Sequence, residues 1–595
     1  MARRSTRDRV PPIRLGVNLL WGSDSEDEEE LSVQEDADFR ESLNDFFAED
    51  YNDDYDYNED HNDPEGNASK PAFIWRSARS QNDLPEFETH RFRGPRMSKW
   101  CNRPLASLKE LDMFFMFLPE EFWKTVVQYS NEGKLEGDKF EFTYSKLLRF
   151  LSFVILKRIS GAERVADIWS KEPYYRNDFI AEILSYRDFW SISRLLRINR
   201  KITEPHEDKL YKIRPMVTEL NRNSSSLFKL ERYVSLDEAS PGYSGRTSLK
   251  KRTKHKKVPE AFQFFTLCDS RTGYCFQFEA AFDNIAAKSN ENQFSKTQNA
   301  VLRLIGSLEQ NWHVVVMDNY YSSPTLCSEL LNRKQLVLGT WRSSYGVPKC
   351  LDLPKLQGKS LETARNQEIV VAYCNEIRVN GESNMIDVIV GATLYDSSLV
   401  KFISTDKFTF WEKEIGGQKK VERYAIQHAY NSGMNGVDIL DQLVDVYSTY
   451  IKSNKWWKRL FYWLLDVALV NSYIVMKESN YSLTHRKLLA NVALQSLEKA
   501  VELEKVDIQT SPEQPTIEIP KKSIWRLTEK NQNNSVRLLG NHVVELVGKR
   551  HRCALCYFHK KDIYATTYCD TCKKYLCLHP CWNIFHSNDR LIKIK

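Results

Sequence analysis

Residues 312–319 read WHVVVMDN, and this stretch decides the fold class. Its apolar part is rich in β-branched residues and shows no polar alternation, which is typical of a strand buried on both faces. Asp318 follows this strand directly. The carboxyl end of a buried strand is the edge at which open α/β sheets place their chemistry. The stretch therefore predicts an α/β fold with a candidate site at the sheet edge.

Two further aspartates stand at comparable places. Asp237 closes the apolar stretch 233–236, which also predicts a strand. Asp438 opens a helical pattern, and Asp441 lies three residues later on the same helical face. A single aspartate at the end of an element is commonly a turn former or a helix cap, and Asp441 is equally compatible with an exposed local cap.

Taken together, the aspartates indicate a site for divalent metal, because converging carboxylates repel one another and a cation relieves that repulsion. Two ions roughly 4 Å apart can activate an attacking oxygen and stabilise a leaving one. Mg²⁺ suits oxygen ligands and leaves room for phosphate and water. The predicted chemistry is cleavage or joining of phosphodiesters.

Segments around these aspartates resemble the piggyBac-type DDD transposases. Three catalytic motifs of that family have counterparts here: SLDE (235–238) with GYSGR (242–246), VMDNYYSS (316–323), and YN (430–431) with GVD (436–438) and DQ (441–442). GTWR (339–342), KWWKR (455–459) and NSY (471–473) match as well. The likeness runs from about Pro104 to the last cysteines, and ordered motifs over that distance are specific.

The resemblance implies an α/β multidomain protein, with an RNase H-like catalytic core, an insertion domain, a flanking helical DNA-binding domain and a C-terminal cysteine-rich zinc domain. It implies a DNA transposase in which Asp237, Asp318 and Asp438 hold two Mg²⁺ ions and Asp441 is a supporting carboxylate. In the family, water frees a 3′-OH, a hairpin forms, and the element is joined at TTAA. The implied partners are double-stranded DNA and a second copy of the chain. The alternative is a domesticated protein that keeps the fold and binds DNA or chromatin without cleaving it.

Composition, periodicity and the resemblance together place the domain boundaries. The predicted order is a disordered acidic region (1–95), a helical dimerisation and DNA-binding domain (96–230), the catalytic core (231–343), an insertion (344–424), the rest of the core (425–447), the rest of the helical domain (448–505), a linker (506–545) and the zinc domain (546–595). The most apolar stretch, 460–476, contains Asp466 and Asn471, which predicts a buried helix rather than a membrane span.

The charge is distributed unevenly along the chain. Residues 24–65 hold 20 acidic residues and one basic residue, which leaves 84 Lys and Arg against 60 Asp and Glu elsewhere. A basic body suggests a polyanionic partner such as nucleic acid. No secretory signal is visible, and we expect a nuclear location.

The most basic stretch is 246–257, with seven Lys or Arg in twelve positions. Three interpretations are open: a contact with the DNA backbone beside Asp237, a nuclear localisation signal, or a solvated hairpin. The candidate DNA contacts are Arg246, Lys250, Lys251, Arg252, Lys254, Lys256 and Lys257, with Arg342 added by family analogy. The family usually carries a Lys-Pro-x-Lys-x-Gly-like stretch here, but 254–262 lacks the glycine and changes the order. We therefore expect the DNA contacts beside Asp237 to differ from those of the family.

The C-terminal end carries a dense set of metal-binding residue types. The candidate zinc ligands are Cys553, Cys556, Cys569, Cys572, Cys577, Cys581 and His586, with His579 as a further possibility. Two CxxC pairs at this spacing predict one or two structural Zn²⁺ ions. Such a module would help bind transposon ends by family analogy. A RING- or PHD-like module that binds protein or chromatin, or a ubiquitin ligase, has the same spacing.

Overall fold

The structure is a computed structural model that describes residues 71–86, 90–96, 99–100, 108–201, 207–253, 258–284, 294–342, 346–352, 369–395, 399–416, 421–479, 482–510, 544–558, 563–569, 574–577 and 581–587. The acidic stretch 24–65 and most of the predicted linker lie outside these residues. So do Lys254, Lys256, Lys257, Cys572 and His579.

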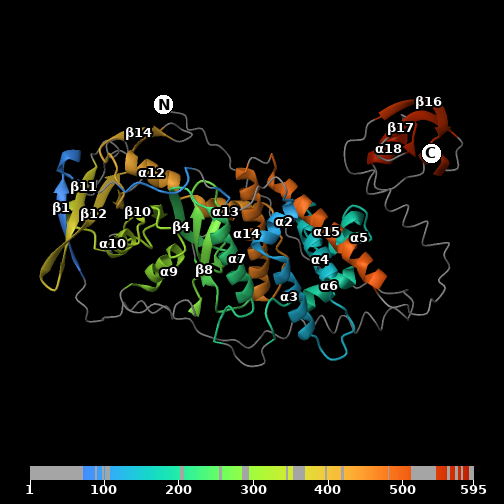
Figure 1. Cartoon of the computed structure of the whole chain (residues 1–595), viewed down its shortest axis with the longest axis horizontal. Helices are drawn as coiled ribbons and strands as arrows, with labels where there is room; N and C mark the ends of the chain where they lie inside the picture. Colours follow the sequence, from blue (N-terminus) through green and yellow to red (C-terminus); the bar gives the residue numbers. More distant parts are fainter. Residues whose placement is uncertain are drawn as a thin grey trace, which may run out of the picture. The chain divides into compact units, whose positions relative to one another are not determined.

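A nine-stranded mixed sheet forms the centre of the fold, in the order β1-β11-β12-β13-β10-β9-β4-β7-β8 (Figure 1). Its strands are β1 (Ala72–Ala78), β4 (Tyr233–Ala239), β7 (Phe264–Asp269), β8 (Cys275–Ala280), β9 (Val314–Met317), β10 (Leu336–Thr340), β11 (Val370–Val379), β12 (Glu382–Tyr395) and β13 (Leu399–Ser404). β4, β9 and β10 run parallel, and the other pairings are antiparallel. The predicted α/β fold is confirmed.

The central parallel strands are buried because they carry continuous apolar runs. All four residues of β9 are buried, as WHVVVM predicts. α9 (Lys296–Ile305) leads into β9, and α10 (Pro324–Asn332) connects β9 to β10. α10 begins as the sequence indicates, since the Ser323 hydroxyl accepts from the Leu326 amide and Pro324 occupies the first turn.

The helical part combines segments from both ends of the described core. The first set is α2 (Glu110–Phe117), α3 (Glu120–Glu132), α4 (Tyr144–Ile159), α5 (Asp178–Ile183), α6 (Tyr186–Leu195) and α7 (Arg214–Leu227). The second set is α14 (Trp456–Glu478) and α15 (His485–Thr510). α15 packs along α4 and α2, while α14 contacts α2 and α7 (Figure 1).

α14 is long and apolar enough to cross a membrane by length and composition, and it is the one such helix in the described part of the chain. However, 89% of its most apolar window is buried inside the fold. Burial against neighbouring helices accounts for its composition, as predicted for 460–476.

Two features of the sheet differ from a simple linear division of the chain. β1 pairs antiparallel with β11, and Arg76 of β1 bonds Asn375 and Glu376. The prediction of disorder up to residue 95 is therefore wrong for residues 71–86. In addition, β11, β12 and β13 come from the predicted insertion 344–424 but extend the central sheet.

The remaining elements are short. Two hairpins are β5 (Lys251–Arg252) with β6 (Glu260–Ala261), and β14 (Lys413–Gly416) with β15 (Val421–Tyr424). β2 (Lys99–Trp100) pairs with β3 (Phe228–Lys229). α12 (Ala425–Gly433) and α13 (Gly436–Val446) follow β15.

The C-terminal module has a small hydrophobic core of its own. It contains the strands β16 (Val544–Arg552), β17 (Tyr564–Cys569) and β18 (Lys574–Tyr575), which form one sheet, and the helices α17 (Ala554–Phe558) and α18 (Cys581–Ser587).

Candidate active site and metal centre

Strand register aligns two of the three predicted carboxylates. β4 and β9 are adjacent and parallel, and Leu236 pairs with Met317. Asp237 is the next residue of β4, and Asp318 directly follows the last residue of β9. In-register residues of parallel strands project toward the same side of a sheet. The two carboxylates therefore stand next to each other at the carboxyl end of the central strands.

The third carboxylate, Asp438, lies in the first turn of α13 and is exposed. The helix packs closely on β4, and the Ser235 hydroxyl donates to the Met434 carbonyl at 2.7 Å. Gly436 permits this approach, because a Cβ there would lie 2.8 Å from both the Asp269 carbonyl oxygen and the Ser235 Cβ. Since Ser235 and Asp237 are two residues apart, Asp237 faces the side of the sheet that α13 covers.

The electrostatics of Asp237 reflect this convergence. Burial raises the pKa of Asp237 to about 7. This value includes smaller contributions from the negative charges of Glu238, Asp318 and Asp438, in that order. A cation would remove this penalty, so the donor set fits a divalent metal.

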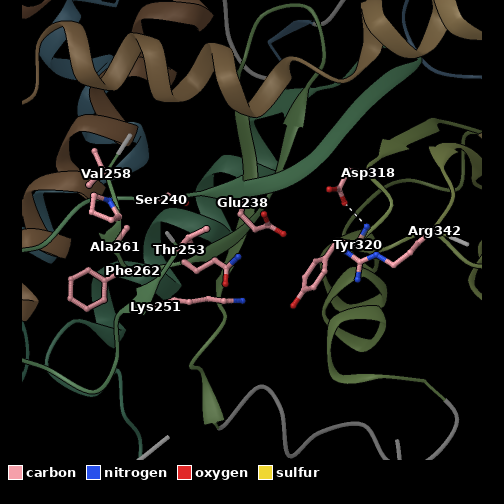
Figure 2. A pocket seen from close by; sticks show the side chains of 12 residues that line it. Glu238, Ser240, Lys251, Thr253, Val258, Ala261, Phe262, Asp318, Tyr320 and Arg342 are labelled. Carbon is pink, nitrogen blue, oxygen red and sulfur yellow. Dashed lines mark hydrogen bonds between the residues drawn. The ribbon is translucent and has the colours of Figure 1, made fainter. Parts of the chain in front are cut away.

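Hydrogen bonds within residues 318–322 hold Asp318 in place. The Tyr320 amide donates to Asp318 Oδ1 at 2.7 Å, and the Ser322 hydroxyl donates to the Asp318 carbonyl at 2.9 Å. Figure 2 shows the first of these bonds. The motif VMDNYYSS thus encodes the turn that holds the carboxylate, not only the carboxylate itself.

Asp441 lies on α13, three residues after Asp438. It contributes to the electrostatics of Arg459 and Cys268, and it is not among the causes of the raised pKa of Asp237. Its predicted role as a supporting carboxylate stays a prediction.

A cleft of about 230 Å³ opens beside Asp318. Its polar lining includes Glu238, Lys251, Tyr320 and Arg342, and Lys251 and Arg342 lie on opposite sides of Tyr320 in Figure 2. The Lys251 ammonium lies 5.9 Å from the centre of the Tyr320 ring. Both cations were predicted as DNA contacts, and their place in the cleft suits phosphate.

Among the other predicted basic contacts, Arg246, Lys250 and Arg252 belong to the described residues. Arg246 and Arg252 are exposed but do not line it. Lys250 is committed to an ion pair, with Nζ 2.7 Å from Glu260 Oε2.

Sequence reasoning assigned no role to the pair Glu238 and Tyr321. The buried Tyr321 hydroxyl donates to the Glu238 carboxylate, which lines the cleft. The available signal was adjacency, because each residue lies within three positions of a predicted carboxylate.

In the C-terminal module, four thiols gather at one point. Atoms of Cys553, Cys556, Cys577 and Cys581 all lie within 4.8 Å of one another. The Cys556 sulfur lies 3.9 Å from that of Cys577 and 3.4 Å from that of Cys581. Tetrahedral zinc with Zn–S bonds of about 2.3 Å requires sulfurs about 3.8 Å apart.

Not all the predicted zinc ligands join this cluster. Cys569 and His586 are described but are not members of the four-thiol group, and His586 Nδ1 lies 2.9 Å from the Trp582 carbonyl. Burial, with help from the neighbouring Cys553 thiol, raises the pKa of Cys577 to about 12. A bound metal ion would instead lower the pKa of Cys577, because the metal binds the deprotonated thiolate.

The chain is similar to known proteins over most of its length. A family model described as Transposase IS4 matches residues 109–473. Human PiggyBac transposable element-derived protein 3 is 21% identical over 476 residues, which cover 78% of this chain and 74% of that protein. Human PiggyBac transposable element-derived protein 5 is 22% identical over 427 residues, which cover 68% of this chain and 76% of that protein.

A solved structure agrees with the fold. The cryo-EM structure of a piggyBac transposase synaptic complex with hairpin DNA superposes with a TM-score of 0.57 at 16% identity. The alignment covers 81% of this chain and 97% of that one. At this identity the likeness concerns the fold alone.

The family match and the fold define the transposase class. The chain belongs to the piggyBac-type transposase family, as the resemblance of its motifs predicted.

Proposed function

We propose that this protein is a metal-dependent DNA transposase that cleaves DNA strands and transfers them to TTAA targets. One observation carries the proposal: in the register of β4 and β9, Leu236 pairs with Met317, so Asp237 and Asp318 each follow a member of the last pair. Asp438 lies close enough to contribute to the raised pKa of Asp237. Such a constellation suits phosphoryl chemistry and has no evident structural purpose.

Each carboxylate has a part in the proposed chemistry. Asp237, Asp318 and Asp438 would hold two Mg²⁺ ions, which activate the attacking oxygen and stabilise the leaving one when bound. The Tyr320 amide keeps the Asp318 carboxylate oriented. Lys251 and Arg342 would contact DNA phosphates along the cleft, where charge is only partly screened.

Several features support the finer points of the proposal. The strand order β8-β7-β4-β9-β10, with three antiparallel strands followed by two parallel ones, suits an RNase H-like core. The solved relative is a synaptic complex with hairpin DNA, which favours double-stranded DNA as the substrate and pairing of two ends by a homodimer. The excess of Lys and Arg outside residues 24–65, together with the proposed DNA substrate, favours a nuclear location.

The test uses purified full-length protein and a pool of DNA duplexes that contain TTAA with randomised flanks. We expect Mg²⁺-dependent nicks and hairpins in wild type, lost with chelator and in Asp318→Asn. Asp352→Asn is the matched control, because Asp352 is an exposed carboxylate that pairs with Lys401 and is not a predicted metal ligand. Nicking by Asp318→Asn at the wild-type rate would contradict the proposal.

A second function is favoured by the names of the relatives, which are element-derived human proteins. Such a protein would keep the fold and bind DNA or chromatin without cleaving it. Wild-type protein that binds the pool tightly but yields no nick or hairpin under any Mg²⁺ concentration would establish this function instead.

A further inference from the structure

Arg459 in α14 is a buried cation that the proposed chemistry does not use. Its side chain is only 7% exposed. Its Nε donates to the Gly242 carbonyl at 2.8 Å, and its guanidinium lies 4.7 Å from the centre of the Tyr450 ring. Its Nη1 is buried and has no hydrogen-bond acceptor among the described residues.

The carbonyl that Arg459 binds lies at the base of the hairpin formed by β5 and β6, which we call the basic hairpin. Gly242 follows β4, which carries Asp237, and forms a bridge with Ala261 of β6. The Tyr243 amide donates to the Glu260 carbonyl at 3.0 Å. Residues 241–243 therefore connect the strand of Asp237 to the hairpin that presents Lys251 to the cleft.

Two further contacts join the same base to the start of α14. The Tyr243 hydroxyl donates to the Asn454 carbonyl, and the Phe262 ring lies 6.3 Å from the Trp456 ring. We name these two contacts and the Arg459–Gly242 bond the hairpin clamp. Because Trp456 and Arg459 lie in the first turn of α14 and Asn454 lies two residues before it, all three contacts tie the hairpin base to the start of this helix.

Acidic residues of α13 and α14 influence the charge of Arg459. Burial lowers the pKa of Arg459, and the charges of Asp466, Asp445 and Asp441 oppose that effect. Asp441 and Asp445 belong to α13, the helix of Asp438. α13 also packs against α14, so α14 contacts both the base of the basic hairpin and the helix that supplies the third carboxylate.

We propose that Arg459 is a positioning residue for strand cleavage, which fixes the Lys251 side of the cleft relative to the carboxylates. The inference rests on the proposed function. Displacement of a reacting group by about 1 Å can cost about 100-fold in rate, so a rigid link between phosphate contacts and metal ligands has kinetic value. Lysine cannot replace it, because one ammonium cannot bond Gly242 and also lie flat on Tyr450.

The experiment compares full-length wild type, Arg459→Lys and Lys458→Met. Lys458 is the adjacent buried cation, but its Nζ donates to the Ser193 carbonyl in the helical part, so it controls for general loss of a buried bond in α14. The substrate is the duplex that wild type nicks best. We measure the single-turnover nicking rate at saturating DNA, the Kd for the duplex, and amide hydrogen exchange across residues 246–253 and 258–262.

For Arg459→Lys we expect a nicking rate at least tenfold lower, a Kd within threefold of wild type, and faster exchange in the hairpin. For Lys458→Met we expect rate and hairpin exchange within twofold of wild type. Arg459→Lys that nicks within twofold of wild type, or equal losses in both variants, would overturn the inference.

Hydrogen exchange separates this inference from the proposed function, because it needs neither DNA nor metal. If wild type nicks no duplex, the proposed function fails, and unchanged hairpin exchange in Arg459→Lys then overturns the clamp as well. Should Arg459→Lys fail to fold, Tyr243→Phe removes the hydroxyl bond to Asn454 with less disruption. It should raise hairpin exchange and lower the rate, both to a smaller extent.

Discussion

Asp466 is a carboxylate buried in α14 that holds the chain segment after α13. Asp466 accepts from the Thr449 amide at 3.0 Å, the Thr449 hydroxyl at 2.7 Å and the Ser448 hydroxyl at 2.9 Å. Burial nevertheless dominates and raises the pKa of Asp466 from 3.8 to about 7. A shift of this size corresponds to about 4 kcal/mol of free energy between the two protonation states.

The sign of the resulting pH dependence follows from linkage. Between pH 4 and 7, the folded protein holds a proton on Asp466 that the unfolded chain has released, so this residue makes stability fall as pH rises. Asp466→Asn removes that slope. We expect the thermal midpoint of the variant, relative to wild type, to rise by a few degrees from pH 5 to pH 8. A difference that is constant or falls with pH would contradict this assignment.

At the residue scale, the sequence predicted the features that depend only on neighbouring positions in the chain. Asp237 and Asp318 were found because each follows an apolar run; in the structure Asp237 lies within β4, two residues before its end, and Asp318 directly follows β9. The Glu238–Tyr321 bond joins side chains 83 positions apart, so its existence depends on register that no local pattern specifies. The same is true of Arg459, whose acceptor lies 217 positions earlier.

At the element scale, the position of α13 determines whether Asp438 reaches the other carboxylates. Gly436→Ala would place a methyl group 2.8 Å from a backbone carbonyl, and the helix would have to shift. We expect a loss of about 1–3 kcal/mol in stability and at least a tenfold loss in nicking rate. Thermal unfolding and single-turnover assays measure both quantities.

Ser432→Ala is the matched control for this change, because Ser432 is exposed in α12 beside the same junction. It should retain wild-type stability and rate. Equal behaviour of the two variants would show that α13 tolerates displacement and that its close packing is not needed for cleavage.

The elements themselves were predictable to different degrees. β4, β9 and the helices from α2 to α7 follow from apolar periodicity, because each buries a continuous face within its own segment. β1 was missed because Ala72–Ala78 follows a long polar region, and its pairing depends on β11, nearly 300 residues away. The addition of β11–β13 to the central sheet likewise depends on contacts between distant segments, which local sequence patterns do not specify.

At the scale of the whole molecule, charge separation should regulate DNA affinity. Residues 24–65 are strongly acidic, whereas the remainder is basic. Deletion of residues 1–70 spares β1, which begins at Ala72. We expect the deletion to tighten DNA binding several-fold at 50 mM salt and to matter little at 500 mM, because screening shortens the range of the repulsion.

The control for this deletion is a full-length chain in which Asp and Glu of 24–65 are changed to Asn and Gln. Its Kd for DNA should equal that of the deletion variant if the negative charge of residues 24–65 weakens binding. Identical Kd values for all three proteins at low salt would exclude an electrostatic role for residues 24–65.

The four-thiol cluster makes a separate prediction for the C-terminal module. Purified protein should carry at least one zinc per chain by elemental analysis, and Cys577→Ser should carry one fewer. Cys350→Ser should leave the zinc content unchanged, because Cys350 belongs to the main core. Full zinc content in Cys577→Ser would rule out this ligand set.

The pairing of β1 with β11 has a consequence for how the protein is made. A ribosome adds about 5–20 residues per second, so Ala72–Ala78 emerges some 15–60 seconds before its partner strand exists. During that interval its apolar Phe-Ile-Trp run has no strand to pair with. Nascent chains should therefore engage a chaperone at this segment, and the edge of the sheet should be the last part of the core to close.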